Sequence, residues 1–477
     1  MKHRIPLHIF ICLLIGLMAC NCSNPDDPSD PGTPKVLPVG VWTTSGNQVN
    51  LLYHKTIDFA TAEDTRFPVL DIKTTETFQT MDGFGYSLTG GSAILLHQMN
   101  ATARAAILKE LFGKDSADIS VSYLRISIGA SDLDPVVFSY DDLPNGITKD
   151  LTLQYFSLSR DTTALIPVLK EILSINPSIK IMGSPWSAPT WMKSNNNSVG
   201  GNLKPEYYSV YADYFVKYIQ AMRNEGITID AITPQNEPQH GGNNPSLVMS
   251  AAQQGDFIKN HLGPKLQAAG LNTKIVIWDH NCDRPDYPIE ILNDASAKQY
   301  VQGSAFHLYN GDVSALSAVH DAHPDRALYF TEQWTGSTST FDGDLEWHIK
   351  NVIIGTARNW SQVALEWNLA SDPQFNPHTP GGCTQCKGAI TIDGSNVTRN
   401  VAYYIIAHAS KFVPAGSVRI NSTNPGAISN VAFKTPEGKT VLIALNEGND
   451  IQSFNIHAGD KWITASLHSN TAGTFVW

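Results

Sequence analysis

The sequence predicts an α/β protein, a (β/α)8 TIM barrel with a side β-sandwich built from both ends of the chain. Three observations predict this fold class. The chain of 477 residues is long enough for a large barrel and a smaller companion domain. Between residues 78 and 412, strand-length apolar runs alternate with helical patterns. On both sides of that region, short runs alternate between apolar and polar residues.

Eight segments have the composition of barrel strands, and several are continuous apolar runs, as expected of strands buried on both faces of a parallel sheet. An open doubly wound sheet is the rival architecture, but no Gly-x-Gly-x-x-Gly motif follows the first strand. The closed barrel is therefore favoured. The eight segments are Phe78–Phe84, Val121–Ile128, Ile179–Ser184, Ile229–Pro234, Lys274–Trp278, Val301–Leu308, Ala327–Thr331 and Gln362–Trp367.

Helical patterns lie between these strands, with apolar residues recurring every three or four positions. They predict helices at Ala93–Phe112, Thr162–Ile175, Pro205–Glu225 and Asp344–Arg358, and one after the eighth strand at Arg399–Phe412. Together with the strands, they assign residues 76–413 to the barrel.

The segments that flank the barrel predict a small β domain. Residues 36–75 contain the strand-like stretch Val49–Lys73, and residues 414–477 contain short runs separated by turn signals. Because the two ends of a barrel chain lie close together, we expect both flanks to build one β-sandwich. The C-terminal runs are Ser417–Asn421, Ile428–Lys434, Thr440–Asn446, Gln452–His457, Trp462–His468 and Gly473–Trp477.

The N-terminus predicts export. An apolar run after a basic start ends in Leu17-Met18-Ala19-Cys20, which resembles a bacterial lipobox. Residues 1–19 are thus an expected lipoprotein signal peptide and Cys20 the expected lipidated residue. Residues 20–35 have the composition of a flexible acidic tether. We expect an outer-membrane lipoprotein held by this lipid anchor at the cell surface; the periplasmic face and a soluble secreted protein are the alternatives.

Two further cysteines, Cys383 and Cys386, form a Cys-x-x-Cys pair in a glycine-rich segment. A structural zinc site needs four ligands, and the sequence has no second pair. No thioredoxin-like βαβ setting surrounds the motif. In an oxidising compartment we therefore expect a local disulfide between the two cysteines.

The charge balance excludes some partners. Lys and Arg total 33 against 44 acidic residues, a net charge of −11, so we expect no basic face for nucleic acid. Only 16% of residues are charged, while the chain has 10 Trp and 16 Tyr. Neutral hydroxyl and amide groups beside aromatic rings suit a carbohydrate partner.

Carboxylates, amides and indoles stand at the C-terminal ends of the predicted strands, where the active site of such a barrel forms. Glu237 follows strand four and Glu332 follows strand seven, and these strand ends face each other across the barrel. Glycoside hydrolysis needs two such carboxylates, and a separation of about 5–5.5 Å would predict retention of configuration. Motifs for a serine nucleophile, a metalloprotease or a phosphate loop are absent. We expect no metal and no cofactor.

Other residues at these strand ends have competing interpretations. Glu366 is a rival nucleophile, or it points outward to Arg358 or another cation. Arg125 is expected to orient Glu237 or a neighbour through a charge-assisted hydrogen bond. Surface or loop positions are expected for three histidines without metal-ligand spacing, which are His240, His280 and His348.

Several segments together resemble glycoside hydrolase family 30, in the order of that family and from about Phe78 to the C-terminus. They are Asp82-Gly83-Phe84-Gly85, Ser184-Pro185-Trp186-Ser187-Ala188-Pro189-Thr190-Trp191, Thr233-Pro234-Gln235-Asn236-Glu237-Pro238, Glu366-Trp367-Asn368-Leu369 and Ser410-Lys411-Phe412-Val413-Pro414-Ala415-Gly416-Ser417. The resemblance implies that Glu237 is the acid/base and Glu332 the nucleophile. It also implies that the subsite for the cleaved sugar is lined by Asp132, Trp186, Asn236, His307, Tyr309 and Trp367. A packed core position for His307 and a loop cap for Asp132 remain alternatives.

Within that family, the segment Gly381–Cys386 is more similar to the β-1,6-glucanase branch than to the glucosylceramidases. The resemblance therefore implies a retaining endo-β-1,6-glucanase that cleaves β-1,6-glucan, such as pustulan or fungal cell wall glucan, through a covalent glucosyl-enzyme. The alternatives are a glucosylceramidase or an exo-acting β-glucosidase of the same family, and a non-catalytic glycan-binding lipoprotein. A monomer is expected.

Overall fold

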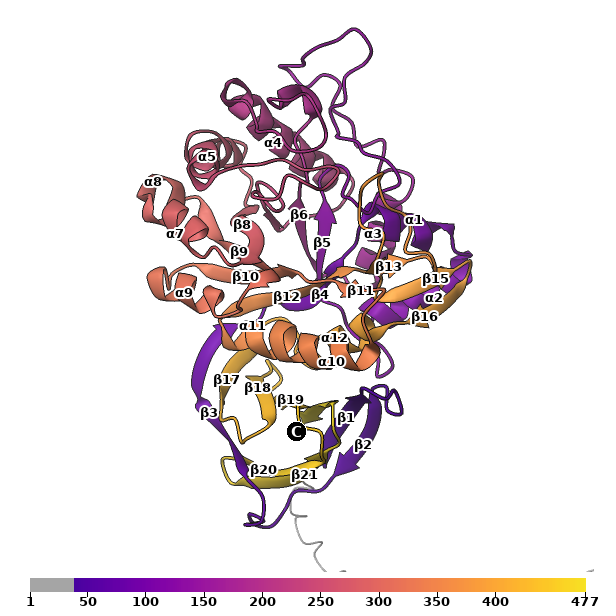
Figure 1. Cartoon of the computed structure of the whole chain (residues 1–477), viewed down its shortest axis with the longest axis vertical. Helices are drawn as coiled ribbons and strands as arrows, with labels where there is room; N and C mark the ends of the chain where they lie inside the picture. The colour runs from indigo at the N-terminus through magenta and orange to yellow at the C-terminus, as the bar shows by residue number, and fades with distance from the viewer. Residues whose placement is uncertain (1–37) are drawn as a thin grey trace, which may run out of the picture. The chain divides into compact units, whose positions relative to one another are not determined.

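Eight parallel strands close into a barrel in the computed structural model, which describes residues 38–477 (Figure 1). The predicted signal peptide, Cys20 and the tether at residues 20–35 lie outside the described residues. Around the barrel, the strands follow one another in chain order. They are β4 (Gly83–Ser87), β5 (Tyr123–Ser127), β6 (Lys180–Ser184), β7 (Ala231–Ile232), β8 (Lys274–Cys282), β9 (Val301–Gly311), β10 (Ala327–Glu332) and β12 (Ser361–Asn368).

The barrel interior is a packed core. Buried side chains from its strands form one cluster, including Tyr123, Met182, Val276, Tyr329 and Leu365. Strands β4 and β5 can approach closely because Gly85 has no side chain. A Cβ at this position would lie only 1.9 Å from the carbonyl oxygen of Tyr123. Every residue of β4 and β5 is buried, as expected of strands covered on both faces, and this includes the polar side chains of Arg125 and Ser127 in β5.

The first barrel strand begins later than its sequence pattern suggested. The predicted strand Phe78–Phe84 joins two different strands, since β3 (Val69–Thr80) belongs to the flanking sheet and β4 begins at Gly83. The predicted segment covers the end of β3, a break of two residues and the start of β4, and composition alone did not reveal this break. The expected boundary between residues 75 and 76 falls inside β3.

The helices cover the outside of the barrel, and their breaks have local causes. The predicted helix Ala93–Phe112 is two helices, because the Asn100 side chain accepts a hydrogen bond from the Ala103 N–H at 2.9 Å and starts a new one. The helices between β7 and β9 were missed, since they are short and one contains a π-helical turn. The helical elements are α1 (Gly90–Gln98), α2 (Ala101–Phe112), α3 (Leu165–Ile175), α4 (Tyr208–Asn224), α5 (Ala251–Phe257), η3 (Ile258–Leu262), α6 (Gly263–Ala268), α7 (Asp286–Asn293), α8 (Ala295–Lys298), α9 (Ala315–Ala322), α10 (Phe341–His348), η4 (Ile349–Gly355), α11 (Thr356–Arg358) and α12 (Val401–Ser410), with short turns η1 (Thr190–Met192) and η2 (Pro205–Tyr207).

The flanking strands from both ends of the chain form one nine-stranded sheet, which confirms the predicted side domain (Figure 1). Its order is β2-β1-β22-β19-β18-β17-β3-β20-β21. The members not yet given are β1 (Val39–Ser45), β2 (Tyr53–Ile57), β17 (Val418–Ser422), β18 (Ile428–Lys434), β19 (Thr440–Asn446), β20 (Gln452–Ala458), β21 (Lys461–Leu467) and β22 (Thr471–Val476).

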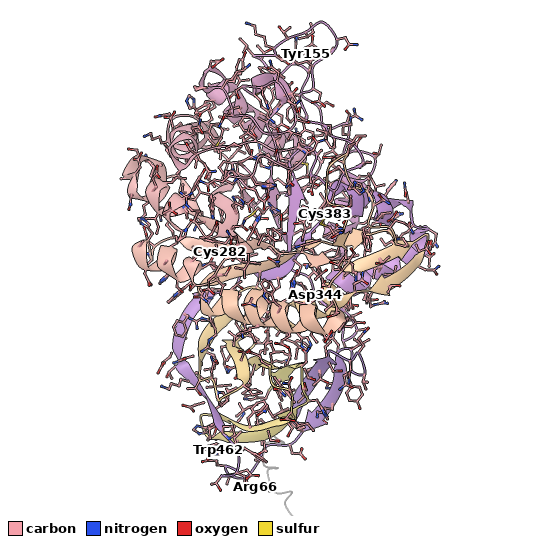
Figure 2. All side chains as sticks on the ribbon, viewed as in Figure 1. Arg66, Tyr155, Cys282, Asp344, Cys383 and Trp462 are labelled. Atoms are coloured by element: carbon pink, nitrogen blue, oxygen red, sulfur yellow. A yellow bond between two sulfur atoms is a disulfide. The ribbon has the colours of Figure 1, made fainter. Side chains whose placement is uncertain are left out.

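Both faces of the middle strands are buried. In β19, Leu442 and Ala444 lie in the core of the β domain, whereas Val441, Ile443 and Leu445 belong to the core cluster of the barrel. His408 of α12 fastens the two domains, because its ring nitrogens contact the hydroxyls of Thr44 and Thr474 at 2.9 Å each. Figure 2 shows Trp462 and Arg66 at the end of the sheet remote from Cys383.

Two small sheets lie among the loops of the barrel. One pairs β11 (Thr335–Gly336) with β14 (Cys386–Lys387), and the other contains β13 (Ala370–Ser371), β15 (Ile390–Asp393) and β16 (Asn396–Arg399). Among residues 38–477, no helix combines the length and the apolar character needed to cross a membrane.

Candidate active site

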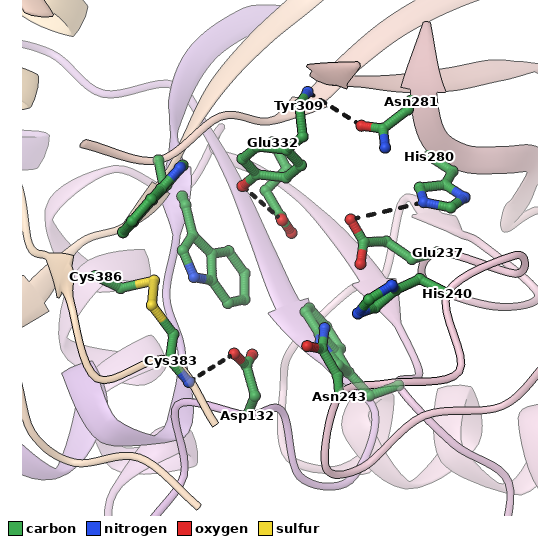
Figure 3. A pocket seen from close by; sticks show the side chains of 13 residues that line it. Asp132, Glu237, His240, Asn243, His280, Asn281, Tyr309, Glu332, Cys383 and Cys386 are labelled. Atoms are coloured by element: carbon green, nitrogen blue, oxygen red, sulfur yellow. Dashed lines mark hydrogen bonds and ion pairs between the residues drawn. A yellow bond between two sulfur atoms is a disulfide. The ribbon is translucent and has the colours of Figure 1, made fainter. Parts of the chain in front are cut away.

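The two predicted carboxylates meet in one pocket. Glu332 is the last residue of β10, and Glu237 follows β7. Both line a cavity of about 290 Å³ at the C-terminal ends of the barrel strands (Figure 3). The other lining residues are Asp132, Trp186, His240, Asn243, His280, Asn281, Tyr309, Trp334, Trp367, Cys383 and Cys386.

Glu332 is held by two hydrogen-bond donors. Arg125 Nη1 donates to Oε2 at 2.6 Å, and the Tyr309 hydroxyl donates to Oε1 at 2.9 Å. The arginine side chain is fully buried and the glutamate side chain is 7% exposed, so water screens this ion pair little. The contacts stabilise the ionised carboxylate. Of the two expectations for Arg125, contact with Glu237 or with a neighbour, the structure shows the second, because Arg125 contacts Glu332 and not Glu237.

Glu237 has a different environment. Its Oε1 lies 3.2 Å from His307 Nδ1 and 4.0 Å from His280 Nε2. Its backbone has a φ of +46°, a conformation that costs energy for a residue with a Cβ and that persists where the surroundings enforce it. The Glu237 N–H donates to the Asp279 carbonyl at 3.0 Å, which helps to enforce it.

The two carboxylates are close enough to influence each other. One potential ligand atom from each of Glu237, His307 and Glu332 lies within 4.8 Å of the others. Burial and the neighbouring negative charge of Glu237 raise the pKa of Glu332, whereas His307 and Arg125 lower it. At this spacing, like charges prevent both acids from ionising freely, so the cluster retains a proton.

His307 lies behind the pocket and is fully buried. Its Nε2 contacts Asp279 Oδ1 at 3.1 Å, and its Nδ1 faces Glu237. Burial alone would lower the pKa of His307, but the surrounding carboxylates, Glu332 first, raise it to about 9. The structure thus places His307 against the carboxylates instead of among the residues that line the pocket.

Asp279, which lies in β8 three residues before its end at Cys282, organises this region and received no role in the sequence analysis. Its carboxylate accepts hydrogen bonds from Arg125 at 2.9 Å and from three buried hydroxyls. Burial raises the pKa of Asp279, but the Arg125 charge and the His307 contact hold it well below its usual value. The hydroxyls belong to Ser184, Thr233 and Thr331.

Aromatic rings form one wall of the pocket. Trp186 and Trp367 stack with ring centroids 5.2 Å apart, and the Arg125 guanidinium lies 4.8 Å from the Trp186 ring. Arg125 Nη2 also donates to Asn236 Oδ1 at 2.6 Å, which orients the amide. Asn236 is buried and, like His307, lies outside the set of lining residues.

Asp132 and the two cysteines lie on the opposite side of the pocket from Glu237, His280 and His240 (Figure 3). Cys383 and Cys386 are joined by a disulfide. The Cys383 N–H donates to Asp132 Oδ2 at 3.3 Å. Burial, followed by the charges of Glu332 and Glu237, raises the pKa of Asp132 to about 7.

Some residues occupy positions other than those expected. Glu366 is buried and contacts His348 Nδ1 at 2.7 Å, so it points neither to Arg358 nor into the pocket. His348 and His280 are buried rather than on the surface. Asp279 and His280 were not predicted as site residues, although they directly follow the predicted strand Lys274–Trp278. That position at a strand end could have indicated that they belong to the site. His240, Asn243 and Trp334 line the pocket from loops whose path the sequence did not reveal, and Asn281 lines it from the last residues of β8.

Glu237, His307 and Glu332 also lie close enough together to hold a metal ion. Among residues 38–477 they are the group of metal-ligand side chains with this spacing. Both His307 nitrogens already face carboxylates, and Arg125 already balances the charge of Glu332. The same three residues have the spacing of an acid/base and nucleophile pair with a supporting histidine.

Comparison with known proteins agrees with the geometry. Residues 81–413 match the glycosyl hydrolase family 30 TIM-barrel domain, and residues 416–475 match the glycosyl hydrolase family 30 beta sandwich domain. The chain is 37% identical to endo-1,6-beta-D-glucanase neg1 of Aspergillus fumigatus, over 83% of this chain and 85% of that protein. It is 36% identical to endo-1,6-beta-D-glucanase BGN16.3 of Trichoderma harzianum, over 83% and 84%. The solved structure of an endo-beta1,6-glucanase superimposes with a TM-score of 0.86 at 36% identity, covering 92% of this chain and 99% of that one.

Proposed function

The chain belongs to glycosyl hydrolase family 30, and from this membership we propose that it is a retaining endo-β-1,6-glucanase. The observation that carries the proposal is the pair Glu237 and Glu332, with oxygens within 4.8 Å across the pocket. Such closeness leaves no room for the water that an inverting enzyme places between its carboxylates at about 6.5–9.5 Å. The similarity to endo-1,6-beta-glucanases over most of the chain supports the choice of linkage.

In the first step, Glu332 is the nucleophile. Its carboxylate oxygen forms a bond to the anomeric carbon of a glucosyl residue, and the bond from that carbon to the O6 of the next residue breaks. Arg125 and Tyr309 hold the carboxylate ionised and correctly oriented before the attack. The product is a covalent glucosyl-enzyme.

The departing oxygen takes a proton from Glu237. Glu237 Oε1 lies 3.2 Å from His307 Nδ1, whose pKa the surrounding carboxylates raise to about 9, so the imidazole can pass a proton to Glu237, while Glu332 has an arginine partner. The proton is thus available on the Glu237 side of the cluster, and Asp279 keeps the imidazole in place. After the transfer, Glu237 is ionised.

In the second step, Glu237 acts as the base. It accepts a proton from a water molecule, the water oxygen bonds to the anomeric carbon, and the bond to Glu332 breaks. The two inversions restore the β configuration. Both carboxyl groups return to their initial protonation states.

The glucosyl residue is bound by neutral and aromatic groups. Trp186 and Trp367 present rings at the pocket wall, and Asp132 offers a carboxylate for sugar hydroxyls. The Asn236 oxygen is occupied by Arg125, so its NH2 group is oriented as a donor toward the 2-hydroxyl. Tyr309 completes the set beside Glu332.

We further propose that the protein is exported and anchored as an outer-membrane lipoprotein through Cys20. The support is the lipobox-like end of the apolar N-terminal run and the polar tether that follows it. Labelling cells with radioactive palmitate tests this proposal, and loss of the label in Cys20→Ala is the expected control result. Release of both forms to the medium without label would contradict it.

The experiment for the activity is digestion of the linear β-1,6-glucan pustulan, with products followed by chromatography over time. A ladder of oligosaccharides at early times is expected, absent in Glu332→Gln. Glucose alone from the start would indicate exo action. No product from pustulan, with cleavage of glucosylceramide instead, would replace the glucanase by the glucosylceramidase alternative.

A further inference from the structure

The disulfide between Cys383 and Cys386 lies in the wall of the active-site pocket, although it contributes nothing to the acid/base chemistry. Both cysteines line the pocket together with Asp132 and Glu332 (Figure 3). The loop that contains it connects Thr379 with β14. Its two ends are attached to different sides of the glucose-binding region.

The first end of the loop holds Asp132. The Thr379 N–H donates to the Asp132 carbonyl at 2.9 Å, and the Cys383 N–H donates to Asp132 Oδ2 at 3.3 Å. Between them, a Cβ at Gly382 would lie 2.3 Å from the Asp132 carbonyl oxygen, so the backbone approaches as closely as glycine permits. The loop therefore contacts both the backbone and the carboxylate of Asp132.

The second end of the loop is attached to the strand that follows Glu332. Cys386 in β14 pairs with Gly336 in β11, and the Ser337 N–H donates to the Gln385 carbonyl at 2.9 Å. The Cys386 side chain also packs in one cluster with Trp186 and Trp367. This end is therefore fixed against the aromatic wall.

We propose that the Cys383–Cys386 disulfide is a positioning element of the glucose subsite, which holds the Cys383 N–H against Asp132 and so orients that carboxylate toward the sugar. The bridge links the Asp132 end of the loop to the end fixed beside Glu332, so the subsite keeps its shape between turnovers. This inference rests on the proposed function, because the subsite is defined by the sugar that Glu332 attacks.

The charges around Asp132 make the hydrogen bond from the Cys383 N–H important. Asp132 is 6% exposed and lies near the charges of Glu332 and Glu237, which together with burial raise its pKa, whereas the Cys383 N–H lowers it. A hydrogen-bond acceptor in such a position depends on a fixed donor to keep its orientation. When the bridge opens, the loop gains freedom and this donor is lost first.

A double-mutant cycle tests the inference by measuring the affinity for the glucose-like inhibitor 1-deoxynojirimycin with calorimetry. The four proteins are the wild type, Cys383→Ala with Cys386→Ala, Asp132→Ala, which removes the acceptor of the Cys383 N–H, and the combination. Opening the bridge is expected to weaken binding roughly tenfold in the wild type, the loss typical of a hydrogen bond to a charged group. In the Asp132→Ala background it is expected to weaken binding less than about twofold, because coupled residues are not additive.

Equal losses in both backgrounds, or no loss in the wild type, would overturn the inference. Cys282→Ala is the matched control, since this free buried cysteine is outside the pocket, and its affinity should equal that of the wild type. If the cysteine variant does not fold, the same comparison uses native wild type and Asp132→Ala, each treated with dithiothreitol. The two thiols of dithiothreitol form a cyclic disulfide, and the disulfide of Cys383 and Cys386 is reduced to two thiols. These cysteine thiols are then alkylated and identified by mass spectrometry.

Failure of the proposed function remains distinguishable in this design. Wild-type protein that leaves pustulan intact would contradict the glucanase assignment, while the inhibitor affinities would still decide the role of the bridge. Hydrolysis of pustulan together with additive losses would keep the glucanase and reject the positioning role.

Discussion

Glu237 and Glu332 are chemically identical side chains, and their partners make them different. Glu332 faces a buried guanidinium and a phenol, whereas Glu237 faces two imidazoles. A guanidinium stays protonated at every relevant pH and stabilises an anion, while an imidazole can return a proton. The division between nucleophile and acid/base thus follows from the neighbours on β5, β8 and β9.

Replacing each glutamate should give a distinct kinetic result. Glu332→Gln should lose all measurable activity on every β-glucoside, because no nucleophile remains. Glu237→Gln should reduce kcat about 10²- to 10⁴-fold for poor leaving groups, the usual contribution of a general acid. The loss should be small for 2,4-dinitrophenyl β-glucoside, whose leaving group needs no proton. Glu206→Gln, an exposed glutamate, is the control. Equal losses on both leaving groups in Glu237→Gln would contradict its role as the acid.

Chelation should leave the activity unchanged. Glu237, His307 and Glu332 have spacing that could hold a metal, but His307 already contacts Asp279 and Glu237, and Glu332 already pairs with Arg125. We expect the same rate of pustulan hydrolysis before and after dialysis against EDTA. A loss of activity that zinc or calcium restores would show that this cluster binds a metal instead.

At the scale of elements, β3 connects the two domains. The Gln79 amide donates to the carbonyls of Ala357 and Ser361 on the barrel, and its oxygen accepts from Arg419 Nε of β17 at 3.0 Å. The Arg419 guanidinium lies 3.5 Å from the centre of the Phe78 ring. The end of β3 therefore connects the sheet to the barrel through the polar contacts of Gln79 and the contact between Arg419 and the Phe78 ring.

Arg419→Ala should destabilise the fold by about 1–3 kcal/mol, the sum expected for a buried cation–π contact and a charged hydrogen bond. Arg419 is 6% exposed, and burial lowers its pKa to about 10, so the side chain is still charged at neutral pH when it makes these contacts. Urea unfolding measures the change, and the activity of the remaining folded protein should stay normal. Arg66→Ala removes an exposed arginine beside Phe67 and should have no effect. Equal free energies of unfolding for Arg419→Ala and the wild type would contradict this stabilising role of Arg419.

At the scale of the whole molecule, buried carboxyl groups make stability depend on pH. Burial raises the pKa values of Asp132, Asp134 and Asp161 to about 7. Between about pH 4 and pH 7 the folded protein binds protons at these groups that the unfolded chain has released. Each group therefore contributes stability that is complete below pH 4 and is lost as the pH rises toward 7.

Asp161→Asn isolates one of these groups, because asparagine imitates the protonated acid and can still accept from the Tyr140 hydroxyl. The variant should match the wild type near pH 4 and be more stable than it by about 1–4 kcal/mol at pH 8. Urea unfolding at both values measures this, with the exposed Asp460→Asn as a control. A constant difference across the range would contradict burial of a titrating acid.

The sequence predicted the elements whose signal is local. The C-terminal strands β18 and β19 were predicted at Ile428–Lys434 and Thr440–Asn446, where the structure has them, since turn residues separate short runs. The helices α5 to α6 were missed because a π-helical turn interrupts their period. The prediction joined two strands in Phe78–Phe84, because composition does not indicate which sheet a strand belongs to.

By itself, the sequence determined the barrel, the side sheet, the positions of Glu237 and Glu332 at strand ends, and the likeness to the family. These follow from periodicity and from motifs contained in single segments. Only the tertiary structure decided that Arg125 contacts Glu332, that His307 and Asp279 stand behind Glu237, and that the cysteine loop holds Asp132. Each of these contacts joins residues from different strands or loops, and such a contact exists only after the barrel has closed and brought the strand ends together.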